Sequence, residues 1–288
     1  MKFYGNLLAL CSLNANVWGT TAFSVQAPKA SSSVVLKSSN PSDLDLFPEG
    51  TFPSTETIQG GGTVRTYKLP PWATRVQYTL KTNGRPLKAK VGLWLGPIRQ
   101  VHTMEIDSQD GSKTPYSATL KFKKLAPMLK ITTSDNLELP VLAAVSVPSP
   151  ERAIELKDNT ERLWGMATPE QKQLVQGGST SGGGGSIRFW NIPDNVESVQ
   201  VISWSFDVGK KSFKCQIEAI QGQNNPKQDF FLQCGGGSQP YHAVIQTPGP
   251  GWMIRLKNKK FVEDGLFQFA VIPYQVSSTD YTQPRTWP

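Results

Sequence analysis

The 288-residue sequence is poor in the side chains that carry most enzyme chemistry. It has two histidines, His102 and His242, three cysteines, and no CxxC, HExxH, GxSxG or Walker motif. A catalytic triad or a histidine-based metal site needs several such groups close together. We therefore expect no enzymatic activity, no cofactor and no metal site. Both histidines are expected to be half-buried or surface side chains.

The cysteines give little support to a redox role. Cys11 lies in the N-terminal segment, which leaves Cys215 and Cys234 for the body of the protein. Without a CxxC spacing, small buried hydrophobic side chains are the favoured interpretation. A disulfide between the two stays open, because sequence alone does not place it.

Charge is also scarce. Charged residues make up 18% of the chain and leave a formal net charge of +8, and no run of five basic residues occurs. This mild surplus favours weak attraction to acidic surfaces over a nucleic-acid-binding groove. No apolar run reaches the roughly 20 residues that span a bilayer. We expect a soluble product with no nucleic-acid partner and no membrane insertion.

The N-terminus has the pattern of an address. Residues 1–22 combine Lys2, a short apolar stretch and small residues before a cut, as in a signal peptide. Residues 23–45 begin FSVQAPKASSSVVLKSSN, a serine-rich composition typical of a plastid transit peptide. Together they resemble the bipartite presequence of algae with secondary plastids. This predicts the plastid stroma, and plain secretion is the alternative.

What the sequence does contain is a repeat. GGGTVRTYKLPPWATRVQY at 60–78 aligns without a gap, at a shift of 123, with the stretch that begins GGGGSIRFWNIP at 182. Further on, PYSATL at 115–120 aligns with PYHAVI at 240–245 at a shift of 125. Matches in one order over such a distance predict an internal duplication. A period of this length is the size of a whole domain.

Each half consists of short runs that alternate apolar and polar residues, such as RVQYTLK and KVGLWL, with turn sequences between them. This predicts an all-β fold of two tandem homologous β-sandwich domains, at 58–149 and 182–276. A barrel is the alternative architecture.

The segments outside the two halves are polar but carry aromatic side chains. Residues 150–181 are predicted to be a linker with a short helix that begins at Thr168, followed by a flexible Gly-rich stretch. Residues 277–288 are predicted to be an extended C-terminal tail. Aromatic residues on polar segments are candidate docking anchors. As a self-assembly interface we name Trp164, Tyr274, Tyr281 and Trp287.

Two functions fit this composition. In the first, repeated halves present complementary surfaces, so that copies of the chain join into an open array. In the second, a tandem carbohydrate-binding β-sandwich module uses a row of exposed Trp and Tyr side chains. The second predicts secretion and an appended enzyme, and neither is evident here.

The two Gly-rich, Arg-bearing openings, GGGTVRTYKLP and GGGGSIRFWNIP, and the PYxA in each half resemble the diatom pyrenoid shell proteins (PyShell) over residues 58–276. The resemblance implies a structural protein without catalytic residues. Its copies would tile into a sheet around the Rubisco matrix of the pyrenoid and support CO2 concentration and carbon fixation. The implied partner is a further copy of the chain, with Rubisco or other pyrenoid proteins as additional candidates. The implied contacts include the terminal extension, here Tyr274–Pro288.

Overall fold

The computed structural model describes residues 45–122, 127–175, 186–205, 212–222, 225–235, 241–259 and 267–277. The first half holds β1 (Glu56–Ile58), β2 (Val64–Lys68), β3 (Arg75–Lys81), β4 (Leu87–Leu95), β5 (Arg99–Ser108), β6 (Tyr116–Lys121), β7 (Met128–Thr133) and β8 (Val141–Ser146). After helix α1 (Pro150–Met166), the second half holds β9 (Lys172–Val175), β10 (Ile187–Asn191), β11 (Val196–Ser205), β12 (Ser212–Gln221), β13 (Pro226–Gly235), β14 (Tyr241–Gln246), β15 (Trp252–Asn258) and β16 (Phe267–Val276). The predicted presequence, the Gly-rich stretch and nearly all of the tail lie outside the described residues.

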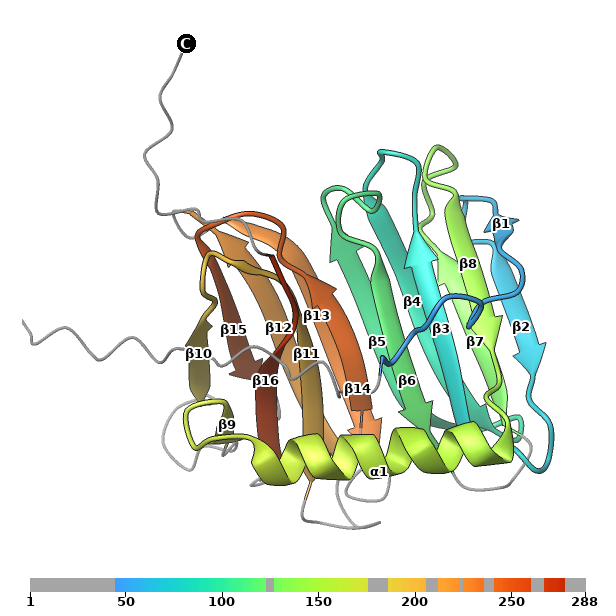
Figure 1. Cartoon of the computed structure of the whole chain (residues 1–288). Helices are drawn as coiled ribbons and strands as arrows, with labels where there is room; N and C mark the ends of the chain where they lie inside the picture. The colour runs from blue at the N-terminus through green and yellow to red at the C-terminus, as the bar shows by residue number, and fades with distance from the viewer. Residues whose placement is uncertain are drawn as a thin grey trace, which may run out of the picture. The chain divides into compact units, whose positions relative to one another are not determined.

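The strands form two antiparallel sheets of eight, which face each other across an apolar core (Figure 1). Sheet A has the order β1-β8-β3-β6-β14-β11-β16-β9, and sheet B the order β10-β15-β12-β13-β5-β4-β7-β2. Alternate side chains of the strands fill the space between the sheets, as in the BeBeB pattern at the start of β4. The prediction of an all-β sandwich is confirmed. The barrel alternative is wrong, because among the described strands neither sheet closes on itself and each ends in two edge strands.

Both sheets run through both halves of the chain. From the centre outward, sheet A reads β6, β3, β8, β1 in one direction and β14, β11, β16, β9 in the other. Sheet B reads β5, β4, β7, β2 and β13, β12, β15, β10. Corresponding strands therefore occupy corresponding places about the centre. A duplication would produce this arrangement, although the duplication itself stays an interpretation of the sequence. The predicted domains are joined edge to edge and share one core.

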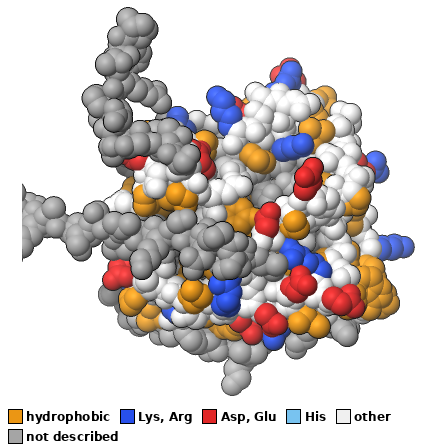
Figure 2. All heavy atoms as spheres, viewed as in Figure 1, with side chains coloured by type: hydrophobic (Ala, Val, Ile, Leu, Met, Phe, Trp, Pro, Cys, Tyr) orange, Lys and Arg blue, Asp and Glu red, His pale blue; other side chains and the backbone are white. Residues whose placement is uncertain are grey.

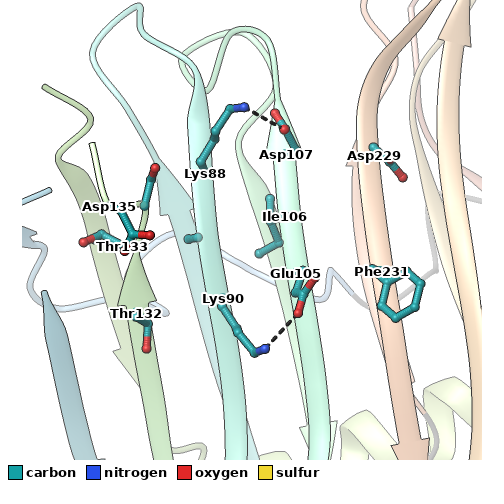
Figure 3. Close-up of a pocket in the computed structure, with 12 residues that line it drawn as sticks. Lys88, Lys90, Glu105, Ile106, Asp107, Thr132, Thr133, Asp135, Asp229 and Phe231 are labelled. Atoms are coloured by element: carbon teal, nitrogen blue, oxygen red, sulfur yellow. Dashed lines mark hydrogen bonds and ion pairs between the residues drawn. The ribbon is translucent and has the colours of Figure 1, made fainter. Parts of the chain in front are cut away.

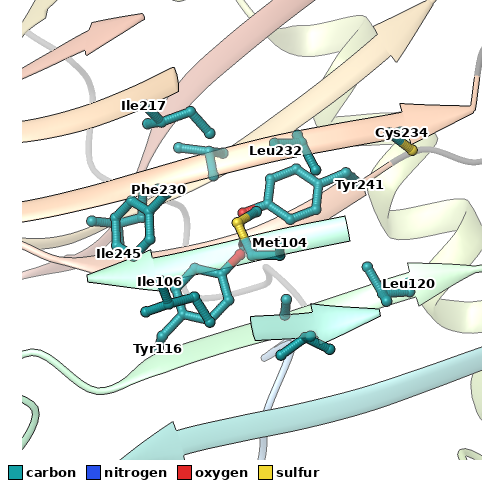
Figure 4. Packing of buried hydrophobic residues seen from close by; sticks show 14 of the residues in the cluster. Met104, Ile106, Tyr116, Leu120, Ile217, Phe230, Leu232, Cys234, Tyr241 and Ile245 are labelled. Carbon is teal, nitrogen blue, oxygen red and sulfur yellow. Dashed lines mark hydrogen bonds between the residues drawn. The ribbon is translucent and has the colours of Figure 1, made fainter. Parts of the chain in front are cut away.

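The junction between the halves uses repeated residues. Strands β6 and β14 pair with Ala118 opposite Ala243, two positions that the shift of 125 aligns. The hydroxyls of Tyr116 and Tyr241, aligned by the same shift, hydrogen-bond inside the core (Figure 4). The ring centroid of Phe230 on β13 lies 5.0 Å from that of Tyr116. The buried cluster is continuous across the junction, so the halves cannot separate without exposing it.

Helix α1 crosses the outer face of sheet A, over strands from both halves (Figure 1). Ser149 caps it by accepting the amide of Arg152 at 3.2 Å, and Pro150 occupies the first turn. Leu156 packs on Val244 in one small cluster. Leu163 packs with Ile202, Ala270 and Ile272 in another. The helix buries one face and leaves charged residues on the other, as expected for an amphipathic surface helix.

The contacts at the two ends of α1 show that it ties the halves together. In the first half, Arg75 of β3 donates from Nε to the carbonyl of Ala153 at 3.0 Å. In the second half, Trp164 stacks on Trp204 of β11 with 5.8 Å between ring centroids. Lys172 places its ammonium 5.2 Å from the Trp164 ring. The helix thus bridges the junction on the outside of sheet A.

The prediction of a short helix that begins at Thr168 gives the wrong position for the helix of this linker. Thr168 and Gln171 do form the reciprocal bonds of a helix cap, at 3.0 and 3.3 Å. From Lys172 onward, however, the chain pairs with β16 as an edge strand and buries Val175 completely. This tertiary pairing outweighs the local cap, and the linker's helix is α1. Within the described residues, no helix is long and apolar enough to cross a bilayer.

Candidate assembly surfaces

Both histidines are interior side chains, so the expectation of half-buried or surface positions was wrong. His242 is 2% exposed and lies between Thr160 Oγ1, 3.0 Å from Nδ1, and Gln200 Oε1, 3.1 Å from Nε2. Burial, with the nearby charge of Arg75, lowers the pKa of His242 to about 3. Burial alone lowers the pKa of His102 to about 3. Both rings are neutral at physiological pH and serve packing.

The two cysteines of the body of the protein are buried, as the favoured interpretation predicted. Burial raises the pKa of the Cys215 thiol far above its ordinary value and that of Cys234 to about 12. A thiol held protonated in an apolar core is a poor nucleophile and metal ligand. Among the described residues, no group of three His, Cys, Asp or Glu side chains could hold a metal ion.

A groove with a volume of about 580 Å³ runs over the outer face of sheet B (Figure 3). Lys88 pairs with Asp107 at 3.0 Å, and Lys90 pairs with Glu105 at 2.8 Å. All four side chains are about half exposed, and ion pairs of this kind contribute about 0–1 kcal/mol each. These four charged side chains form ion pairs between the neighbouring strands β4 and β5. The groove is therefore interpreted as a solvated sheet face.

A second charged row continues this face into the other half. Glu218 on β12 accepts hydrogen bonds from Arg255 and from Lys257, the latter at 2.8 Å. Burial alone would raise the pKa of Glu218, but these two cations hold it below its usual range. Asp229 has the opposite shift: burial raises its pKa, and Glu218 and Asp107 add to the rise against a lowering bond from Gln216. These contacts stabilise β12, β13 and β15 side by side.

Exposed aromatic side chains are few. In the described part of the chain, Trp72 (46%) and Phe189 (50%) are the exposed aromatic residues. Trp190 and Trp252 are buried, and each donates its indole N–H to a carbonyl. Figure 2 shows acidic and basic side chains interspersed with hydrophobic ones on the side of sheet A and α1. The row of exposed aromatics that a sugar-binding platform requires is not found among these residues.

Two of the four residues named as a self-assembly interface can be located. Trp164 lies on Trp204, and Tyr274 bonds through its hydroxyl to Asp45 and to the amide of Leu46, the latter at 3.2 Å. Both therefore make contacts within the chain and are only partly exposed. Tyr281 and Trp287 lie outside the described residues. A role of these four residues between copies stays a prediction.

The open edges of the sheets are the surfaces that the sequence did not reveal. At the first end, the backbone N–H and C=O groups of Val64, Thr66 and Lys68 in β2 point away from the sheet. The odd-numbered residues of this strand are the ones that hydrogen-bond to β7. At the second end, the backbone N–H and C=O groups of Ile187, Phe189 and Asn191 in β10 point away from the sheet, since the even-numbered residues of this strand hydrogen-bond to β15. The alternation in SIRFWNI was visible in the sequence. Nothing there showed that the strand would lie at an edge, where one side stays open.

These observations define a class: an all-β protein of two continuous sheets, with buried histidines and thiols, in which the described residues place no further strand beside the edge strands at either end. A finer identification comes from comparison with protein families. The model of the family described as "Diatom pyrenoid shell protein" matches residues 50–273, and the chain belongs to that family. The resemblance seen in the sequence is confirmed, and the family name places such proteins in the pyrenoid of a plastid.

Two solved structures are distantly similar to this chain. A turret protein of Sulfolobus turreted icosahedral virus is 11% identical, over 76% of this chain and 96% of that chain, with a TM-score of 0.20. The tandem CBM22 domain of Paenibacillus barcinonensis Xyn10C is 11% identical over 81% and 96%, with a TM-score of 0.24. Similarities this low carry no argument about function. A search of curated proteins found no match.

Proposed function

We propose that the protein is a structural subunit without enzymatic activity, whose copies assemble into a protein sheet around the Rubisco matrix of the pyrenoid. In this role it would support CO2 concentration and carbon fixation in a diatom-type plastid. The observation that carries the proposal is membership of the diatom pyrenoid shell family over residues 50–273. The partner is a further copy of the chain, and Rubisco or another pyrenoid protein is a candidate for the inner side.

The architecture supports this role. A subunit of a thin shell has to be stiff, and two eight-stranded sheets around one core, bridged by α1, give a unit without a hinge between its halves. It must also offer attachment points in opposite directions, and in the described part of the chain each sheet ends in an edge strand in each half. Open edges are ready templates for pairing with another chain.

The two sides of the unit differ, as a shell with an inside and an outside requires. The outer face of sheet A is covered by α1 and by the segment from Asp45 to Phe47, which Gln77 and Arg152 bind through the carbonyls of Leu46 and Asp45. The outer face of sheet B carries no helix in the described residues and presents rows of ion pairs. Subunits that join in one orientation would form a layer with two chemically distinct surfaces.

Electron microscopy of the purified protein tests the proposal. Sheets or tubes that form on concentration, and that pellet in a sedimentation assay, are the expected result. The tandem carbohydrate-binding module predicts dispersed single copies that bind glucan resin. A protein that stays dispersed at high concentration and is retained on glucan would contradict the shell function. Adding Rubisco to the pelleting assay then asks whether it is bound directly.

A further inference from the structure

We propose that copies join head to tail: β10 of one copy pairs antiparallel with β2 of the next, and Phe189 enters a hollow beside that β2. The inference rests on the proposed function, because it names the surfaces through which the assembly grows. The occupant of each open edge is a second copy of this chain.

Strand direction permits this joint. Every pair of neighbouring strands in sheet B is antiparallel, and the sheet has eight strands. With an even number of alternating strands, β10 and β2 at the two edges run in opposite directions. A copy shifted along the sheet without being turned over therefore brings its β10 antiparallel to β2. The same count applies to β9 and β1 of sheet A, so both sheets can continue together.

The junction inside the chain is a working example of such a joint. There, β5 pairs with β13 and β6 with β14, each strand with its repeat counterpart and both sheets at once. The strands β2 and β10 are also repeat counterparts, and each has five residues. The proposed contact repeats the internal one at the outer edges, and it continues both sheets across the boundary between copies.

A hollow at the first end is suited to an apolar side chain. It has a volume of about 200 Å³ and is lined by Thr66, Trp94, Gly96, Pro97, Met128 and Lys130. For comparison, a cavity of roughly 150 Å³ is enough to bind benzene. The side chain of Trp94 packs over the backbone of Gly92, where a Cβ would lie 2.6 Å from Gln100 Nε2 and 3.0 Å from Trp94 Nε1. That indole nitrogen is buried without a hydrogen-bond partner among the described residues.

The second end supplies the matching side chain. Phe189 is 50% exposed and Ile187 45% exposed. Both alternate with the buried Trp190, so their side chains lie on the outer face of sheet B. The register that overlaps all five residues of both strands places Phe189 opposite Thr66, a small side chain at the rim of the hollow. From there the ring can reach Met128 and lie against Lys130, whose ammonium favours an aromatic face.

Polar side chains bind two backbone carbonyls of the second edge while a copy is alone. Gln173 Nε2 donates to the carbonyl of Phe189 at 3.3 Å, and Arg188 Nη1 donates to the carbonyl of Ile187 at 3.0 Å. A neighbour's backbone amides would replace these two donors, exchanging one set of hydrogen bonds for another. The joint then depends on the apolar contact of Phe189 for its net stabilisation. This makes Phe189 the residue to test.

The test uses two variants of the purified chain, Phe189→Asp and Thr66→Asp, each of which places a carboxylate in the contact. The control is Ile154→Asp, which adds the same charge at an exposed apolar position of α1. All three positions are exposed, so each variant is expected to unfold at the wild-type temperature. The assay is analytical sedimentation together with electron microscopy.

Head-to-tail joining predicts that each Asp variant alone stays a single copy, because every contact then contains the added charge. An equimolar mixture of the two is expected to form dimers and nothing larger, since only one intact joint can form. The control is expected to assemble like the wild type. Wild-type assembly by Phe189→Asp, or dimers of that variant alone, would overturn the inference and leave the proposed function standing. A wild-type chain that never assembles would overturn both.

Discussion

The bridging role of α1 predicts a large loss of stability when Leu163 is truncated. Leu163 is 5% exposed and packs with Ile202, Ala270 and Ile272 on the outer face of sheet A. Its replacement by Ala removes apolar groups worth ~0.8 kcal/mol per CH2 and leaves a cavity. Because this cluster is small and close to the surface, it can partly collapse. We expect the free energy of unfolding to fall by about 2–3 kcal/mol, near the lower end for buried leucines.

Urea denaturation monitored by tryptophan fluorescence measures this change in the free energy of unfolding. The stacked rings of Trp164 and Trp204 report on the contact between α1 and sheet A. Ile154→Ala is the control, because Ile154 is on the same helix but 60% exposed. Its expected effect is within about 0.5 kcal/mol. Equal effects of the two substitutions would show that α1 does not rest on sheet A as described.

The continuous sheets, the contacts of Glu218 and the predicted C-terminal tail each support one further prediction. Because both sheets and the core cross the junction, heat should unfold the whole chain in one calorimetric transition; two separate transitions would mean that the halves are independent. Glu218→Gln should cost about 1.5–3 kcal/mol at pH 7 through the loss of charge-assisted bonds. Since the pKa of Glu218 is lowered in the folded state, its contribution is present above the unfolded-state pKa of about 4.3 and is lost as the pH falls through the folded-state value. The variant should therefore lose less stability than the wild type in an acid titration, and parallel curves would refute this. Deletion of residues 277–288 should weaken assembly while leaving the unfolding temperature unchanged, and equal sedimentation of truncated and full-length assemblies would refute a role for the tail.

Sequence periodicity was enough for the fold class. Alternation in segments such as RVQYTLK, together with the turn sequences, predicted strands such as β3 and β4. The shift of 125 aligned two tyrosines that meet at the junction. The pairing of halves into continuous sheets could not be derived in this way. Alternation shows which face of a strand is buried, but not which strand lies next to it.

The helix shows a second limit. The sequence predicts a helix start at Thr168, although Ser149 and Pro150 are equally good signals for one. Local capping signals do not show which candidate helix forms, because tertiary contacts also contribute. The chain after Thr168 is stabilised more by strand pairing with β16 than by a helix. The histidines were misjudged for a related reason. His242 is tolerated in the interior because Thr160 and Gln200, from two other elements, satisfy both ring nitrogens.

The candidate site was the part least accessible from sequence. Aromatic residues on polar segments looked like anchors, but Trp164 and Tyr274 make contacts within the chain. Phe189 looked like one alternating strand residue among many. Its exposure follows from the position of β10 at the edge of sheet B, which is a property of the assembled sheet.

In the proposed assembly, copies of the chain meet at the two ends of the double sheet. Cryo-electron microscopy of the assembled protein, at a resolution that separates strands, tests this claim directly. We expect both sheets to continue from copy to copy, with β10 beside β2 of the neighbour and Phe189 next to Trp94 and Met128. Copies that touch through the outer faces of the sheets, with β2 and β10 left open to solvent, would contradict it.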